Sequence, residues 1–114
     1  MQKIEVVLGS DCVQSVSDAL RRAKIAALQT SPVVLLDLRR GPDATYRGVS
    51  YTAGREKAKL ELVLPDHEVQ FAIEAICEGI EPFGEKDAEL VVLEIQDVVC
   101  LRSVRRERKT RSMR

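Results

Sequence analysis

Two short segments of this sequence are apolar at consecutive positions, and they restrict the fold more than any other feature. These segments are Val33–Leu36 and Leu90–Val92. A strand places successive side chains on opposite faces, so an apolar run without alternation predicts a strand that is covered on both faces. Two helices can cover only one face of a small sheet. An identical sheet is the simplest cover for the other face, so the pattern predicts a homo-oligomer.

The order of the elements follows from hydrophobic periodicity and turn residues. β-rich or alternating runs predict strands over residues 3–8, 33–38, 58–64 and 89–95. Apolar spacings of three and four predict a helix from Ser10 or Asp11 to about Lys24, and a second helix from Pro65 to Gly79. The buried stripe of the second helix is expected to consist of Val69, Ala72, Ile73, Ile76 and Cys77. This βαββαβ order predicts a ferredoxin-like α+β fold, with two helices on one face of an antiparallel sheet.

A long segment between the second and third expected strands has no hydrophobic period. It covers about residues 39–56 and holds both tyrosines, Tyr46 and Tyr51. A structureless loop of this length inside a compact domain is either functional or disordered. An aromatic side chain in such a loop gives high affinity when it packs against a partner. The alternative is that a tyrosine lies across the base of the loop and stiffens it, which we favour for Tyr46.

Composition excludes several classes of protein. The 114 residues suffice for one domain, and no stretch reaches the roughly 20 apolar residues that span a bilayer. The N-terminal segment does not have the pattern of a secretion signal. Three cysteines without CxxC spacing predict reduced thiols in a cytosolic protein, with Cys100 buried in a strand. His67 is the only histidine, so the sequence indicates neither a catalytic triad nor a histidine-ligated metal, and no enzyme activity.

The C-terminal end carries a concentration of positive charge. Residues 102–114 hold seven basic residues and one acid, although the whole chain has no net charge. We expect residues 1–102 to form the domain and residues 103–114 to form a flexible basic tail. The tail could bind nucleic acid, an anionic membrane or an acidic partner. A solvated tail is the favoured interpretation, because no aromatic residue is interleaved for base stacking.

The motif YRGVSY, from Tyr46 through Arg47 and Gly48 to Tyr51, resembles the loop of the PII signal-transduction proteins. The segments KIEVVL, DALRRAKI, KLELVLPD and EAICEGI follow in the order of that family, up to about Arg102. The resemblance implies a homotrimer with its sheets facing inward and its loops touching a target enzyme or membrane transporter. It also implies ATP or ADP in the cleft between subunits, with magnesium and 2-oxoglutarate beside the nucleotide. In some members the tyrosine that matches Tyr51 is modified.

Several positions depart from the family pattern. Arg39 stands where the family has a glutamine that holds magnesium and 2-oxoglutarate, and Cys100 replaces an arginine. The family has a glycine-rich loop whose backbone amides and lysine hold phosphates. This chain has one glycine in the corresponding segment, Gly84, but not at a position where the family has glycine, and Glu89 replaces the lysine. These changes argue against magnesium and 2-oxoglutarate and weaken the case for ATP, ADP or AMP.

A smaller anion remains an alternative effector. Lys86 and Arg102, with Arg39 or Arg40 from a neighbouring loop, could bind it, whereas the plainer interpretation of each is a solvated surface charge. The resemblance thus implies a cytoplasmic, non-enzymatic PII-like regulator that acts in nitrogen regulation. Two alternatives stay open: a ferredoxin-like interaction module that has lost nucleotide sensing, and a nucleic-acid binder that uses the basic tail.

Overall fold

The computed structural model describes residues 1–39, 44–46, 49–51, 54–84 and 88–102. Its strands are β1 (Gln2–Gly9), β2 (Gln29–Leu35), β3 (Ala44–Tyr46), β4 (Val49–Tyr51), β5 (Arg55–Leu64) and β6 (Leu90–Glu94). Its α-helices are α1 (Val13–Arg22) and α2 (Asp66–Ile80), and the short 3-10 helices η1 (Ser10–Cys12) and η2 (Glu81–Phe83) precede α1 and follow α2.

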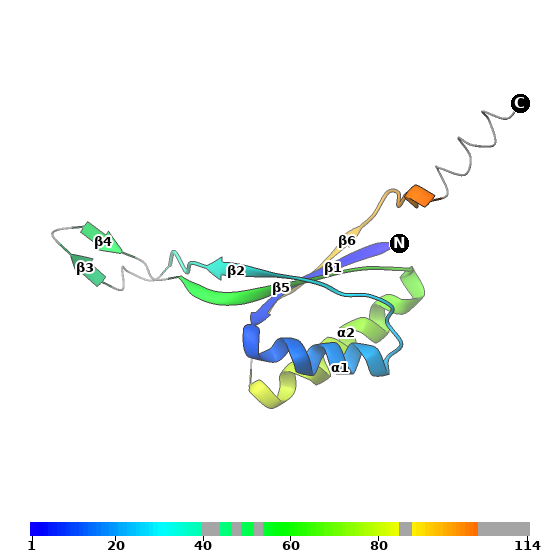
Figure 1. Cartoon of the computed structure of the whole chain (residues 1–114), viewed down its shortest axis with the longest axis horizontal. Coiled ribbons are helices and arrows are strands. Elements are labelled where there is room, and N and C mark those ends of the chain that lie inside the picture. Colours follow the sequence, from blue (N-terminus) through cyan, green and yellow to red (C-terminus); the bar gives the residue numbers. More distant parts are fainter. Residues whose placement is uncertain (40–43, 47–48, 52–53, 85–87, 103–114) are drawn as a thin grey trace, which may run out of the picture.

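The main sheet has the strand order β2-β5-β1-β6, and all its neighbouring strands are antiparallel. Both α-helices lie on the same face of this sheet (Figure 1). The predicted ferredoxin-like α+β fold is therefore confirmed. The β3–β4 pair is a separate two-stranded sheet beyond the end of β2 (Figure 1).

The core lies between the two α-helices and the central strands. Alternate residues of β1 and β5 point toward the helices and are buried, as period-2 patterning requires. These strand residues are Ile4, Val6, Leu8, Ala58, Leu60, Leu62 and Leu64. The helices supply Val16, Ala19, Leu20, Val69, Ala72, Ala75 and Ile76. The predicted buried stripe of the second helix is thus largely correct, but Cys77 is exposed, and Ala75 is buried instead.

The prediction for the second strand of the main sheet was wrong at both ends. β2 begins at Gln29 and ends at Leu35, because it pairs with β5 from Gln29 opposite Glu61 to Leu35 opposite Arg55. The first three residues of β2 are polar, and backbone pairing at a sheet edge does not need an apolar pattern. Pro32 is tolerated there, since an edge strand has one side without ladder hydrogen bonds.

The segment expected to be a structureless loop contains regular structure. Within it, β3 pairs with β4 in antiparallel register, with Ala44 opposite Tyr51 and Tyr46 opposite Val49. β5 also starts at Arg55, three residues before the predicted strand. A short hairpin without an apolar period cannot be recognised from hydrophobic pattern alone.

Both predicted helix ends also shift. α1 ends at Arg22, because Lys24 has a left-handed backbone with φ of 62° and cannot continue the helix. α2 continues through Gly79 to Ile80, so this glycine does not terminate the helix. A Cβ at position 79 would lie 2.6 Å from the Cα of Val16, so Gly79 permits α2 to approach α1 closely.

The C-terminal end differs from the prediction as well. β6 ends at Glu94, and Cys100 is exposed outside any strand rather than buried in one. The expected basic tail, residues 103–114, lies outside the described residues. Within the described ranges, no helix combines the length and the apolar character that crossing a membrane requires.

Candidate functional site

The most prominent candidate site is the projection between β2 and β5, which we call the arm (residues 36–54). Figure 1 shows β3 and β4 well beyond the end of the main sheet, and the described chain extends 71 Å along its longest axis but only 22 Å along its shortest. Tyr46 is the last residue of β3 and Tyr51 the last residue of β4. Both predicted tyrosines are therefore carried on the arm, whereas Arg47 and Gly48 lie outside the described residues.

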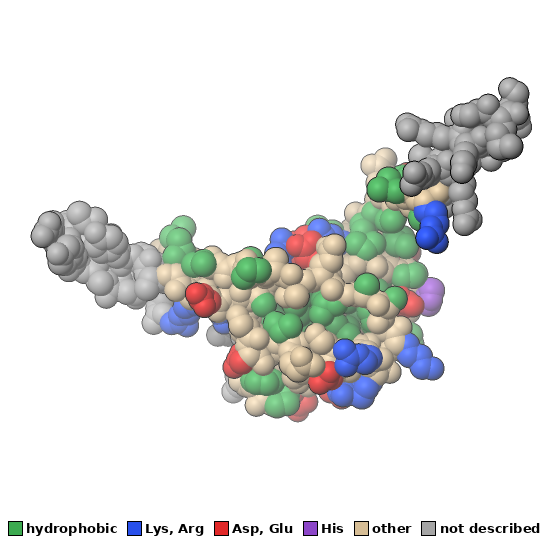
Figure 2. All heavy atoms as spheres, viewed as in Figure 1, with side chains coloured by type: hydrophobic (Ala, Val, Ile, Leu, Met, Phe, Trp, Pro, Cys, Tyr) green, Lys and Arg blue, Asp and Glu red, His purple; other side chains and the backbone are tan. Residues whose placement is uncertain are grey.

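The base of the arm is apolar and exposed. Val34, at the end of β2, has an exposed fraction of 66%, and Leu36 and Leu38 are also exposed. Hydrophobic side chains gather where the main sheet leads into the arm (Figure 2). Gly54 lies under this cluster, because a Cβ at that position would overlap Val34 Cγ1 and come within 3.2 Å of Leu36 Cδ2. The two chain segments that enter and leave the arm are thus in close contact.

Arg39, the predicted anion-binding residue at the start of the loop, is paired with an acid of its own chain. Its backbone N–H donates to Asp37 Oδ1 at 3.1 Å, and its Nε donates to the same oxygen at 3.2 Å. Its Nη2 donates to Asp37 Oδ2 at 3.4 Å, and the Arg39 side chain is 92% exposed. An exposed pair of this kind contributes only about 0–1 kcal/mol, so an anionic ligand could displace it at small cost.

Of the other predicted effector residues, the structure describes Gly84 and Arg102. Gly84 follows η2 with φ of 65°, and its N–H donates to the Glu81 carbonyl at 3.2 Å. Arg102 is exposed at the end of the described chain. The segment after β6 leaves the sheet at the end opposite the arm (Figure 1). Arg39 and Arg102 therefore lie far apart within one subunit, and Arg40 and Lys86 lie outside the described residues.

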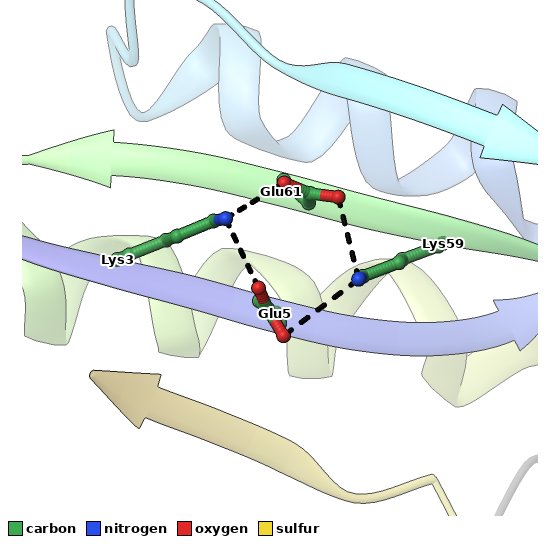
Figure 3. A network of polar contacts seen from close by, with 4 residues as sticks. All are labelled: Lys3, Glu5, Lys59 and Glu61. Atoms are coloured by element: carbon green, nitrogen blue, oxygen red, sulfur yellow. Dashed lines mark ion pairs between the residues drawn. The ribbon is translucent and has the colours of Figure 1, made fainter.

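A cluster that sequence reasoning missed lies on the face of the sheet away from the helices. Lys3 Nζ is 3.0 Å from Glu5 Oε1 and 2.9 Å from Glu61 Oε2. Lys59 Nζ is 3.8 Å from Glu5 Oε2 and 3.5 Å from Glu61 Oε1. We call these four residues the charge quartet (Figure 3). The sequence does hold a signal for it, since Lys-x-Glu occurs at the same phase in both central strands, as KIE and KLE.

The charge quartet shifts the pKa of two of its members. Hydrogen bonds to Glu61 and then Glu5 raise the pKa of Lys3 above the ordinary value for lysine. The hydrogen bond from Lys3 lowers the pKa of Glu61 below the ordinary value for glutamate. Both shifts favour the charged forms, so Lys3 and Glu61 are both ionised around neutral pH.

A metal centre has no support in the described parts of the chain, where no three His, Cys, Asp or Glu side chains are grouped to hold an ion. His67 lies in the first turn of α2, as predicted. The arrangement therefore offers surfaces for binding: the arm with its tyrosines, exposed arginines at both ends, and the charge quartet.

Comparison with known proteins identifies the family, although no protein-family model matches the sequence. The nitrogen regulatory protein P-II of Rhodobacter capsulatus is 31% identical over 104 residues, which are 90% of this chain and 93% of that protein. The nitrogen regulatory protein P-II of Mesorhizobium japonicum is 30% identical with the same coverage. The nitrogen regulatory protein P-II 1 of Methanothermobacter thermautotrophicus is 28% identical, over 90% of each chain. The sequence resemblance is therefore confirmed, and the chain belongs to the PII family of nitrogen regulatory proteins, which are signalling regulators and not enzymes.

Proposed function

We propose that this chain is a cytoplasmic homotrimeric regulator that controls a target enzyme or membrane transporter through its arm. The observation that carries the proposal is the projection of β3 and β4 beyond the main sheet, with Tyr46 and Tyr51 on them. Aromatic side chains on a projecting element are efficient anchors for a partner protein. The names of the relatives point to nitrogen regulation as the process.

The proposed input is a small anionic effector held between subunits. Arg39 follows β2 toward the arm, and Arg102 ends the segment that leaves β6 at the other end of the sheet (Figure 1), so a ligand that binds both is proposed to lie between two subunits. Arg40 and Lys86 are the further cations proposed for this site. An adenine nucleotide is the first candidate, and a smaller anion is the second. Binding would shift the arm between conformations that differ in affinity for the partner.

Magnesium and 2-oxoglutarate are not expected as co-effectors. Arg39 places a cation where a metal-holding side chain would be needed, and like charges repel. We further propose that Tyr51, the last residue of β4 on the arm, is a modification site through which partner binding is changed.

Calorimetric titration of the full chain with ATP, ADP and AMP, with and without magnesium and 2-oxoglutarate, tests whether the chain binds the proposed effector. Arg102→Ala should weaken nucleotide binding by about tenfold or more, as expected for a charge-assisted contact. Arg21→Ala is the control, because Arg21 is exposed like Arg102 but lies on α1, where it pairs with Asp18. Absence of heat at millimolar nucleotide, or an equal loss in both variants, would contradict the proposed site.

Limited trypsin digestion tests whether effector binding changes the conformation of the arm. The arm contains Arg39, and nucleotide binding should change the rate of cleavage in the arm but not in the helices. Cleavage that does not depend on any nucleotide or small anion would support a second candidate, an interaction module without effector sensing. The pairing of Arg39 with Asp37 and the exposed Glu89 favour that second candidate, since both reduce the positive potential available to a phosphate.

A further inference from the structure

The side of α2 that faces away from the sheet carries an exposed aromatic side chain. Phe71 is 60% exposed, whereas the residues of α2 that face the core are buried. Residues three, four and seven apart lie on one side of a helix, so His67, Glu74 and Glu78 share a row with Phe71. All four are exposed, and we call them the outer row. A single exposed apolar residue is common, so the charges around it decide whether the outer row is a binding surface.

The charges of α2 are mostly negative. The helix has four acids and no lysine or arginine. Asp66 and Glu68 lie in the first turn, where the positive end of the helix dipole favours carboxylates. Glu74 and Glu78 lie in the second half of the helix, where the dipole favours cations instead. Arg22 of α1 pairs with Glu78 at 3.2 Å and offsets one of these charges. The outer row therefore attracts further positive charge.

The C-terminal end of the same chain supplies that charge. The chain has 18 basic and 18 acidic residues, and residues 102–114 hold seven of the basic and one of the acidic. The rest of the chain therefore has an excess of six acids. All but one of the basic residues in this segment are arginines. Arginine pairs with carboxylates through its planar guanidinium group and also stacks on aromatic rings. The outer row presents both kinds of group, with carboxylates beside an aromatic ring.

The segment that leads to the tail passes the N-terminal end of α2. The N–H of Ile95 donates to the Met1 carbonyl at 3.1 Å, and the Met1 amino group donates to Asp66 Oδ1 at 2.8 Å. The end of β6 and the start of α2 thus lie at the same end of the sheet (Figure 1). Arg102 lies at most about 25 Å from Ile95, and residues 103–114 can span up to about 40 Å. The tail is therefore long enough to return to α2.

We propose that the outer row of α2 is the docking surface for the basic tail of the same chain, residues 103–114. Tail arginines pair with Glu74 and Glu78, and one of them stacks on the ring of Phe71. Salt screens such contacts, so docking weakens as ionic strength rises. The docked tail is also kept from anionic membranes and nucleic acid, which a free basic segment would bind. The inference depends neither on the proposed effector nor on the arm.

Limited trypsin digestion of the full chain at low salt tests the docking, because trypsin cleaves after the basic residues of the tail. A free peptide with the sequence of residues 102–114 gives the rate for a tail that is not docked. The tail of the unmodified chain should be cleaved about fivefold more slowly than the peptide. High salt should bring the two rates together.

Variants of the outer row test which surface holds the tail. Glu74→Gln and Phe71→Ala should each speed cleavage of the tail by about threefold, since each removes one contact. Asp18→Asn is the matched control for Glu74→Gln, because it also neutralises one carboxylate on a helix surface, but on α1. The control should be cleaved like the unmodified chain. Helical circular dichroism establishes that each variant is folded.

Carbodiimide cross-linking of the unmodified chain identifies the contact directly. Lys109 is the only lysine of the tail, and mass spectrometry should find it joined to Glu74 or Glu78. A mixture of ¹⁵N-labelled and unlabelled chains shows whether the link lies within one copy, as expected. Links only between copies, or a tail cleaved as fast as the peptide at low salt, would overturn the inference. Protection that needs added anionic vesicles or duplex DNA would assign the tail to a polyanion and overturn it as well.

Discussion

Lys24 adopts a left-handed backbone conformation that is unfavourable for lysine. The backbone N–H groups of Lys24 and Ile25 donate to the carbonyls of Arg21 and Leu20, both at 3.0 Å, which is a Schellman arrangement at the end of α1. The position that needs a left-handed backbone is Lys24, with φ of 62°, and glycine adopts that conformation without steric cost.

Lys24→Gly should therefore stabilise the protein by about 0.5–1 kcal/mol, after allowing for the larger freedom of glycine in the unfolded chain. Urea unfolding of both proteins measures the difference. Arg21→Gly is the control, since Arg21 lies within the helix, and it should destabilise by about 1 kcal/mol. A loss of stability in Lys24→Gly would show that the lysine side chain contributes more than its backbone strain costs.

Gly79 and Gly84 provide a second residue-scale comparison. Alanine at Gly79 would press on the backbone of Val16, whereas alanine at Gly84 would meet no atom within 4 Å but would be forced to keep φ of 65°. We expect Gly79→Ala to cost roughly 2 kcal/mol or more through separation of the helices, and Gly84→Ala about 1 kcal/mol through backbone strain alone. Thermal unfolding of the two variants checks the order, and the reverse order would contradict the close helix contact.

At the scale of elements, β1 and β5 carry core residues on one face of the sheet and the charge quartet on the other face. The lowered pKa of Glu61 means that its stabilising contribution is complete above the ordinary glutamate pKa and is lost as pH falls through the lowered value. The raised pKa of Lys3 means that its contribution is complete below the ordinary lysine pKa and is lost as pH rises through the raised value. The ion pair between Lys3 and Glu61 therefore makes its full contribution to stability across the neutral pH range.

Denaturant unfolding at a series of pH values checks the predicted direction in which stability changes with pH. Between pH 7 and about pH 3 the unmodified chain should lose more stability than Lys3→Met, because the variant no longer holds the Glu61 pKa down. Arg22→Met, which leaves the charge quartet intact, should follow the unmodified chain. Parallel pH curves for all three proteins would show that Lys3 and Glu61 are not coupled in solution.

Elements that bury one face could be predicted from the sequence better than edge strands and short hairpins. β1, β5 and the two α-helices were predicted well because each buries one face, and burial leaves a periodic pattern, as in Ile4, Val6 and Leu8. β2 is an edge strand whose first residues pair through their backbones, and the β3–β4 hairpin carries no apolar period. The charge quartet was missed because its contacts join two strands that are far apart in sequence.

At the scale of the whole molecule, the sheet face away from the helices is the proposed surface for assembly, and the arm is the proposed surface for a partner. Residues for an effector site could be proposed from the sequence, but not the pairing of Arg39 with Asp37 or the course of the chain after β6, away from the arm. Those facts depend on tertiary geometry, and they make the proposed effector site dependent on a neighbouring subunit. The proposed effector site therefore depends on assembly of the chain.

Sedimentation equilibrium of the unmodified full chain measures this assembly. A trimer predicts one species of three times the 12.7 kDa chain mass that persists at micromolar concentration. A species of 12.7 kDa across the same range would contradict it, because the sheet face would then stay uncovered and Arg39 and Arg102 could not share a ligand.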